Sequence, residues 1–306
     1  MRILVTGGAG YIGTELVYAL VQQKDVAEVI VYDNLSRSNY NLFINGKMNN
    51  YDKLTFVKGE LLDSRQLKKV LDGVDVVYHL AAKVTTPFAN TDPHFFEQVN
   101  HWGTAELVYA VENSDVRKFI YTSSTGVYGS SKKGVGEEVT PNPKTFYGIS
   151  KMRGEEQVSR LSDKMETYIL RCGNVYGYSK SMRFDAVINK FVFEANFNKK
   201  ITIHGDGRQH RSFIHIDQIA KALAGLLNNT ISSGTYNLVA RDLVVLDIVD
   251  VLKELIQELE FIFVNQHLKL RELKIQPNDE LNSKLGIDTS KSFKDEITEF
   301  RNHLSF

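Results

Sequence analysis

Residues 2–13, RILVTGGAGYIG, decide the fold that the sequence predicts. The stretch begins with a short apolar run typical of a buried strand, and its glycines follow at once. From residue 11 onward, Ile12, Leu16, Ala19 and Leu20 form one apolar stripe of a helix. Glycines between a strand and a helix allow a tight turn, and the helix N-terminus offers N–H donors and a positive dipole end. The stretch therefore predicts a cradle for phosphate groups.

An acidic residue further along the chain points to a dinucleotide. Asp33 ends the next apolar run, 20 residues after Gly13. In a dinucleotide-binding fold, a carboxylate at this position accepts hydrogen bonds from the adenosine ribose. Its charge would repel a 2′-phosphate, so the sequence favours NAD over NADP. Arg37 lies four residues further on and offers an opposing positive charge.

The composition is that of an ordinary globular protein. Of 306 residues, 37 are Lys or Arg and 37 are Asp or Glu, so a formal net charge of zero gives no sign of a nucleic acid or membrane partner. The single cysteine, Cys172, is interpreted as a small buried apolar residue in a reducing compartment, with a nucleophile as the alternative. With no signal-peptide pattern and no apolar run of about 18 residues, we expect a cytoplasmic protein. No metal is expected, because His204, His210 and His215 lack the spacing of metal ligands.

Short apolar runs alternate with amphipathic stretches through the first half of the chain. This alternation predicts a doubly wound parallel α/β (Rossmann) sheet, because continuous apolar strands need helices on both faces. The expected strands are 2–6, 28–32, 54–58, 75–79, 117–122 and 166–171, and the expected helices lie near 11–23, 64–72, 94–113 and 147–162.

The rhythm changes after residue 173. We expect an NAD-binding domain over 1–173 plus about 212–235, and a smaller, mixed C-terminal substrate-binding domain over 174–211 and about 236–306. Further helices are expected at 184–197 and 217–228, with a short strand at 201–203 and a mostly helical tail from 245 onward.

A second group of residues points to acid–base chemistry. Tyr147 and Lys151 lie four residues apart in YGISK (147–151), so a helix places them on one face. An ammonium group beside a phenol favours the phenolate, and we therefore expect Lys151 to lower the pKa of Tyr147. Ser124, within SSTGVYG (123–129), follows an expected strand and can hydrogen-bond the oxygen on which Tyr147 acts.

Together these motifs resemble the extended short-chain dehydrogenases/reductases of the epimerase/dehydratase type, which act on nucleotide-linked sugars. TGGAGYIG (6–13), HLAA (79–82), VNHWGT (99–104), SSTGVYG and YGISK are similar to successive motifs of that family, in the same order, over about residues 1–240. The resemblance implies Ser124, Tyr147 and Lys151 as catalytic residues. It implies cofactor contacts from Gly7, Gly10, Tyr11, Ile12, Gly13, Asp33, Asn34, Glu60, Leu61, Leu80, Ala81, Lys83, Asn100, Tyr147 and Lys151.

The resemblance extends to residues that hold the substrate. LRCGNVYG (170–177) and GDGRQHRSFIHIDQIAKAL (205–223) are similar to family segments that bind the diphosphate of a sugar nucleotide. The resemblance assigns Asn174 and Arg211 to that diphosphate, and a guanidinium fork suits phosphate oxygens. Arg183 in MRFD is a weaker candidate for the same role, and Ser124 would contact the sugar.

Two departures from the family pattern bear on function. Gly59-Glu60 stands where the family usually has Gly-Asp at the adenine. Thr125 and Gly126 stand where the family's 4,6-dehydratases carry Asp-Glu after the catalytic hydroxyl residue. The acid needed for the elimination of water is therefore missing, which disfavours a dehydratase.

The sequence thus predicts an NAD-dependent epimerase acting at C4 of a nucleotide-diphosphate sugar through a transient 4-keto intermediate. An NAD(P)-dependent 4-ketoreductase or 4-dehydrogenase of a nucleotide-linked deoxysugar or heptose is the alternative, since the same three residues serve both reactions. A non-catalytic dinucleotide-binding regulator is a further alternative, disfavoured because those residues are present. By resemblance we expect a homodimer paired through the helices near 94–113 and 147–162. Five apolar residues on these helices lie either at that interface or against the sheet, namely Leu107, Val108, Val111, Val158 and Leu161.

Overall fold

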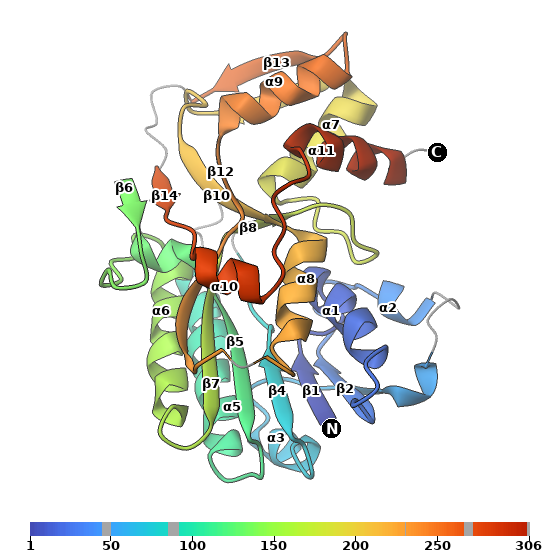
Figure 1. Cartoon of the computed structure of the whole chain (residues 1–306), viewed down its shortest axis with the longest axis vertical. Coiled ribbons are helices and arrows are strands. Elements are labelled where there is room, and N and C mark those ends of the chain that lie inside the picture. The colour runs from blue at the N-terminus through green and yellow to red at the C-terminus, as the bar shows by residue number, and fades with distance from the viewer. Residues whose placement is uncertain (45–49, 85–91, 230, 266–271, 305–306) are drawn as a thin grey trace.

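A computed structural model describes residues 1–44, 50–84, 92–229, 231–265 and 272–304. Seven strands in this part of the chain form the central sheet: β1 (Arg2–Thr6), β2 (Glu28–Asp33), β3 (Leu54–Lys58), β4 (Val76–His79), β5 (Lys118–Ser124), β7 (Glu166–Cys172) and β11 (Gly234–Leu238). Their order is β11-β7-β5-β4-β1-β2-β3, and every neighbouring pair is parallel (Figure 1). The order runs outward in both directions from β1 and β4, which confirms the predicted doubly wound α/β sheet.

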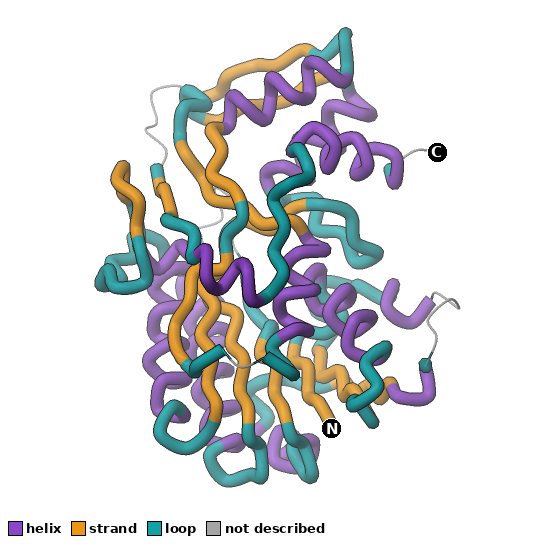
Figure 2. The backbone as a smooth tube through the Cα atoms, in the orientation of Figure 1, coloured by secondary structure: helices purple, strands orange, loops and turns teal. Residues whose placement is uncertain are grey.

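Helices cover both faces of this sheet (Figure 2). The helices of this lower lobe are α1 (Tyr11–Val21), α2 (Asn41–Ile44), α3 (Ser64–Val70), α4 (Pro93–Phe96), α5 (Gly103–Val111), α6 (Phe146–Val158) and α8 (Ile216–Gly225). One face is covered by α1 and α8, which share a core with Ile3 and Val5, and the other by α3, α5 and α6, which share a core with Leu4 and Val77. Burial on both faces explains why the strands read as continuous apolar runs.

A smaller upper lobe lies beyond the carboxyl ends of the sheet (Figure 1). It has its own core, in which Phe191, Ile248 and Phe300 bring three helices together. No helix among the described residues is long and apolar enough to cross a membrane. The elements of the lobe are β8 (Asn174–Tyr176), β10 (His210–His215) and β12 (Arg241–Val244) in one sheet, β9 (Lys200–His204) paired with β13 (Glu260–Val264), and the helices α7 (Val187–Asn198), α9 (Val245–Leu255) and α11 (Phe293–His303).

The prediction of a mostly helical tail was wrong in part. Beside α9 and α11, the tail supplies β13 and a short strand, β14 (Leu273–Ile275), which pairs with β6 (Ser131–Val135). Both strands pair with strands that lie much earlier in the sequence, so no local sequence pattern predicts the pairing. The short helix α10 (Asp279–Lys284) returns to the lower lobe, where Leu281 and Leu285 join the core under α1 and α8.

The proposed division into two domains follows these contacts with two changes. The pairing of β10 with β8 and β12 puts 210–215 in the upper lobe, and α10 packs with the lower one. We therefore propose that the cofactor domain consists of the central sheet, its covering helices and α10, and that the remaining C-terminal elements hold the substrate.

The helix expected near 94–113 consists of three consecutive segments. A π-helix over Glu97–Trp102 separates α4 from α5. Such π-helical turns often occur at functional sites, and this one buries Asn100 completely. The five apolar residues considered for a dimer interface face the sheet instead, because all of them are buried in its core: Leu107, Val108, Val111, Val158 and Leu161.

Candidate active site

The glycine turn between β1 and α1 is tightly packed. Gly7 has a φ of +72°, and a Cβ there would lie 2.6 Å from the backbone nitrogen of Ala81, just after β4. A Cβ on Gly13 would collide with the carbonyl oxygen of Gly7. Packing therefore requires glycine at positions 7 and 13, and the N-terminus of α1 stays uncovered by side chains from this turn.

A cavity of about 850 Å³ opens at the carboxyl ends of β1, β2, β3 and β4. Ligands of doubly wound sheets bind at this edge, where the strand order reverses. The segments that follow these four strands converge here with parts of 92–99 and 183–185. The lining includes the predicted cofactor contacts Gly7, Gly10, Tyr11, Ile12, Gly13, Asp33, Asn34, Glu60, Leu61, Leu80, Ala81 and Lys83.

Asp33 connects the glycine turn with the end of β2. Its carboxylate accepts hydrogen bonds from the backbone N–H groups of Ala9 (3.1 Å) and Leu35 (2.8 Å). Burial raises the pKa of this carboxyl group, and the two hydrogen bonds oppose the rise. Glu60 reaches the same loop, since its carboxylate accepts a hydrogen bond from Asn34 Nδ2 (3.0 Å).

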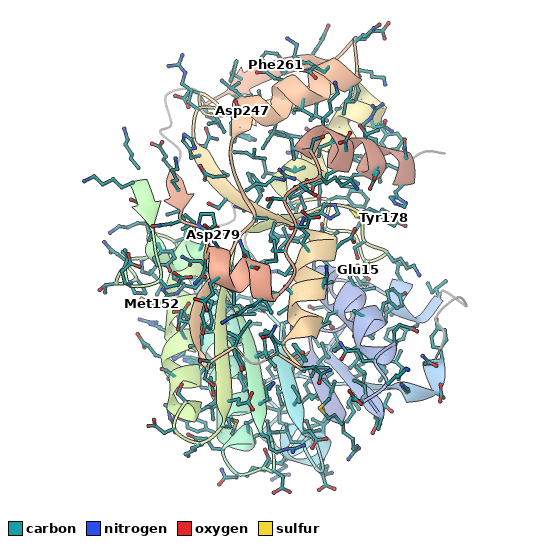
Figure 3. All side chains as sticks on the ribbon, viewed as in Figure 1. Glu15, Met152, Tyr178, Asp247, Phe261 and Asp279 are labelled. Atoms are coloured by element: carbon teal, nitrogen blue, oxygen red, sulfur yellow. The ribbon has the colours of Figure 1, made fainter. Side chains whose placement is uncertain are left out.

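Tyr11 links the glycine turn to the upper lobe. Its hydroxyl donates a hydrogen bond to the carbonyl of Gly177 (2.6 Å) and accepts one from Asn189 Nδ2 (3.1 Å). Glu15, one turn further along α1, accepts a hydrogen bond from the backbone of Lys180 (3.3 Å), and Figure 3 shows Glu15 at this border below the loop that carries Tyr178. The cofactor-side helix thus supports the loop of the upper lobe.

A carboxylate of that loop joins two arginines at the cavity. Asp185 Oδ1 lies 3.2 Å from Arg37 Nη2 and 3.1 Å from Arg183 Nε, and all three residues line the cavity. Arg37 is therefore engaged by a carboxylate of the upper lobe, which weakens it as a partner for a 2′-phosphate. The arrangement agrees with the preference for NAD over NADP that Asp33 predicts.

The structure brings the three predicted catalytic residues to one end of the sheet. Ser124 ends β5, and Tyr147 lies in the first turn of α6, whose start is fixed by Thr145 Oγ1 accepting from Gly148 N (3.0 Å). Burial raises the pKa of Tyr147, and a hydrogen bond with Ser124 opposes the rise. The Tyr147 ring packs edge-on against Phe96, a residue that lines the cavity, at 6.3 Å between centroids.

The expected low pKa of Tyr147 was wrong for this structure, because burial raises that pKa above its ordinary value. The ammonium group of Lys151 lies over the ring of Tyr121, 4.1 Å from its centroid. Burial lowers the pKa of Lys151 to about 7, so its charge is reduced near neutral pH. At Tyr147, burial disfavours the phenolate more strongly than the neighbouring groups favour it.

Asn100 lies behind the cavity and holds its wall. Its side chain accepts a hydrogen bond from Lys83 N (2.8 Å) and donates to Lys83 O (2.9 Å) and Ser150 Oγ (3.0 Å). The π-helical turn thereby connects the segment after β4 with α6, next to Lys151. The predicted cofactor contact at Asn100 is, in this structure, a support for Lys83.

The predicted diphosphate contacts lie in two places. Arg183 lines the cavity, whereas Asn174 and Arg211 lie on the neighbouring strands β8 and β10 of the upper lobe. Asn174 donates to the carbonyl of Ser212 (3.1 Å), and its side chain is otherwise exposed. Their common role in binding a diphosphate stays a prediction.

Several side chains that line the cavity were not predicted from the sequence, among them Phe95, Phe96, Gln98 and Asp185. The first three directly precede VNHWGT (99–104), whose position next to the site is a usable signal. Asp185 lies within MRFD, but its partner Arg37 is 148 residues away in the sequence, so only the fold reveals the pair.

The sequence profile of the NAD dependent epimerase/dehydratase family matches residues 3–238. The chain belongs to this family. A putative UDP-glucose 4-epimerase of Methanocaldococcus jannaschii is 34% identical over 74% of this epimerase/dehydratase chain and 73% of that protein. A dTDP-D-glucose 4,6-dehydratase of Homo sapiens is 32% identical over 84% of this chain and 73% of that protein.

Solved structures of the epimerase/dehydratase type share the fold over the whole chain. A UDP-glucuronic acid 4-epimerase from Bacillus cereus, in complex with UDP-glucuronic acid and NAD, superposes with a TM-score of 0.86 at 26% identity and covers 100% of both chains. This epimerase/dehydratase is therefore an NAD-dependent enzyme of the extended short-chain dehydrogenase/reductase type, as predicted. Its residues fit NAD, because the cavity is lined by the glycine turn at the N-terminus of α1, which suits a pyrophosphate, and by the carboxylate-bearing Asp33, a residue type that suits a ribose.

Proposed function

We propose that this chain is a nucleotide-diphosphate-sugar epimerase that acts at C4 through a transient 4-keto intermediate. The observation that carries the proposal is the hydrogen-bonded pair of Tyr147 and Ser124 beside the NAD cavity, with Gly126 next to it. A Cβ on Gly126 would lie 3.3 Å from Ser124 Oγ and 3.9 Å from the Tyr147 ring. A side chain here would stand beside both hydroxyl groups, and glycine leaves no acid to protonate a leaving water.

In this proposal Tyr147 exchanges a proton with the C4 hydroxyl, and Ser124 hydrogen-bonds the same oxygen. Bound NAD supplies the hydride acceptor and donor. Because burial keeps the phenol of Tyr147 protonated at neutral pH, the ammonium of Lys151 is needed to stabilise the phenolate during proton transfer. Lys151 also holds the nicotinamide ribose.

The substrate is held by its diphosphate, which leaves the sugar ring free to present either face to the cofactor. Arg211, Asn174 and Arg183 are the groups proposed for this grip, since guanidinium and amide donors suit phosphate oxygens. Arg183 lines the cavity, and its charge acts to lower the pKa of Tyr147, which supports a place near both the cofactor and the reacting sugar.

The experiment uses purified protein and UDP-, GDP-, CDP- and dTDP-sugars, beginning with UDP-glucose and UDP-glucuronic acid. We expect NAD to copurify with the protein, and NMR of the C4 proton to show interconversion of C4 epimers without added cofactor. Product that forms only with stoichiometric consumption of NADH or NAD would instead establish the 4-ketoreductase or 4-dehydrogenase. A 4-keto-6-deoxy product would establish a dehydratase.

We also propose that the chain forms a homodimer through the outer faces of α5 and α6. Trp102 and Tyr109 are 53% and 46% exposed on this side, although the apolar residues first considered face the sheet. Light scattering at about micromolar concentration should give twice the chain mass, and the double variant Trp102→Ser, Tyr109→Ser should shift the protein toward the monomer. A monomeric wild-type protein would contradict this proposal.

A further inference from the structure

A buried carboxylate lies directly behind the residues proposed for catalysis. Glu155 stands one turn after Lys151 on α6 and is 7% exposed. Its oxygens accept hydrogen bonds from Arg171 Nη2 (2.8 Å), from Arg171 Nε (3.1 and 3.2 Å) and from Ser123 Oγ. The side chains of Glu155 and Arg171 are each only 8% exposed, so the ion pair is shielded from solvent.

The two partners of Glu155 precede a candidate catalytic residue and a neighbour of Lys151. Ser123 comes immediately before Ser124 at the end of β5, and Arg171 comes immediately before Cys172 at the end of β7. The two strands pair so that Ser124 lies opposite Cys172. One carboxylate therefore ties α6, β5 and β7 together beside the candidate catalytic residues.

Arg171 extends this network to the edge of the sheet. Its Nη1 donates to the hydroxyl of Tyr128 (2.9 Å), which donates to Asn237 Oδ1 (2.8 Å) on β11. The backbone of Asn237 in turn donates to the carboxylate of Glu137 (2.9 Å). Because Arg171 is held by partners on both sides, Glu155 has a fixed place.

Stability alone is a weak reason to bury an ion pair here. Desolvation costs several kcal/mol per ion, and an apolar pair of similar volume is often equally stable. An apolar pair cannot supply a negative charge one helical turn from Lys151. We propose that Glu155 is a positioning residue: through Ser123 and Arg171 it holds Ser124 and Lys151 in register, and its charge keeps the Lys151 ammonium protonated without contact to substrate. This inference rests on the proposed function for its activity readout.

The other neighbours of Lys151 are uncharged at neutral pH. Burial raises the pKa of Cys172 to about 12 and lowers that of His79 to about 3. Burial also raises the pKa values of Tyr121 and Tyr147, so both phenols keep their protons. Among these described neighbours, Glu155 is the acidic residue, and it is held by the guanidinium group of Arg171. The groups that face Lys151 are Tyr147 and Glu155 on α6, Tyr121 on β5, Cys172 on β7 and His79 on β4.

The sign of the expected pH effect follows from these charges. Burial lowers the pKa of Lys151 to about 7, while Cys172, once ionised, and Glu155 act to raise it. Replacing the Glu155 carboxylate by an amide removes a contribution that favours the ammonium form. Lys151 then loses its proton at a lower pH than in the wild type, so any property that needs the ammonium declines at a lower pH.

The test compares Glu155→Gln with Glu156→Gln, the same change at the neighbouring exposed residue. NAD affinity is titrated from about pH 6 to about pH 9, and the pH profile of C4 epimerisation is measured over the same range. For Glu155→Gln we expect the NAD affinity and the rate of epimerisation to decline at a lower pH than in the wild type. The kcat should be reduced about tenfold on the alkaline side and be nearly unchanged on the acidic side. The KM for the sugar nucleotide should stay constant, and Glu156→Gln should match the wild type throughout.

The proposal would be overturned by a folded Glu155→Gln protein whose NAD affinity and epimerisation rate decline at the same alkaline pH as those of the wild type. If the wild type epimerises none of the sugars, the NAD titration still decides the role of Glu155, so the two failures are told apart. A second variant, Glu155→Met with Arg171→Met, separates charge from packing: we expect it to melt near the wild type and to keep the alkaline defect. If it regains the wild-type pH profile, or if neither variant folds, Glu155 is purely structural and the proposal is wrong.

Discussion

The two lobes of the molecule build their parts of the site in different ways. In the lower lobe, four groups at the cavity lie at the ends of strands: the glycine turn follows β1, Asp33 ends β2, Glu60 follows β3 and Leu80 follows β4. In the upper lobe, the strands that carry Asn174 and Arg211 pair with distant segments, and β9 pairs with β13. The cofactor site is therefore encoded locally, whereas the substrate site depends on long-range pairing.

The largest effect is expected at Tyr147, whose pKa is influenced by Arg183 of the upper lobe. Tyr147→Phe should lower kcat by about 10²–10⁴-fold, because it removes the proposed acid and base, while NAD binding survives. Lys151→Ala should impair both NAD binding and rate, and Ser124→Ala should cost less than Tyr147→Phe because water can replace its hydrogen bond. Steady-state kinetics and NAD titration measure these effects, with the exposed Tyr40→Phe as control. Full activity of Tyr147→Phe would refute the mechanism.

The second largest effect is expected for Gly7→Ala, which tests whether the glycine turn after β1 is required for the cofactor site. Its Cβ would lie 2.6 Å from Ala81 N at a φ of +72°, so we expect a loss of about 1–3 kcal/mol of stability and of measurable NAD binding. Gly225→Ala is the matched control, because its Cβ would meet only Leu285 Cδ2 at 3.9 Å. Thermal melting and NAD titration decide; equal behaviour of the two variants would show that the turn is not needed.

A smaller effect is expected at Asp33. Asp33→Ala removes the carboxylate at the proposed ribose position together with its bonds to Ala9 and Leu35. We expect NAD to bind about tenfold more weakly and the discrimination against NADP to relax. Titration of the wild type and the variant with both dinucleotides measures this, and a wild-type preference for NADP would contradict the assignment.

The smallest effect is expected at Asp185, whose carboxylate pairs with Arg37 of the lower lobe and with Arg183. Asp185→Asn weakens the ion pairs with Arg37 and Arg183, which are partly exposed and are worth roughly 0–1 kcal/mol each. We expect NAD to dissociate a few times faster at low salt, and the difference to fade at high salt because ions screen exposed pairs. Stopped-flow release of NAD is the measurement. An NAD dissociation rate that is unchanged at low salt would show that the ion pairs of Asp185 do not retain the cofactor.

Much of the lower lobe could be predicted from the sequence. The strand–helix alternation predicted the parallel, doubly wound sheet that the structure shows. The spacing from Gly13 to Asp33 predicted that the glycine turn and the end of β2 lie at one cavity. Periodicity and glycine sterics act between near neighbours in the chain, so these features are visible without the fold. The strands β13 and β14 were not predicted because each is stabilised by a partner far back in the sequence.

The sequence by itself determined which residue types are present for catalysis and that Tyr147 and Lys151 share one helix face. Only the tertiary structure decided how they are charged: burial beside Tyr121 lowers the pKa of Lys151 to about 7 and raises that of Tyr147. It alone joined Asp185 to Arg37 and Glu155 to Arg171. The physical reason is that desolvation and ion pairing depend on which distant segments are packed together, and spacing along the chain does not specify this.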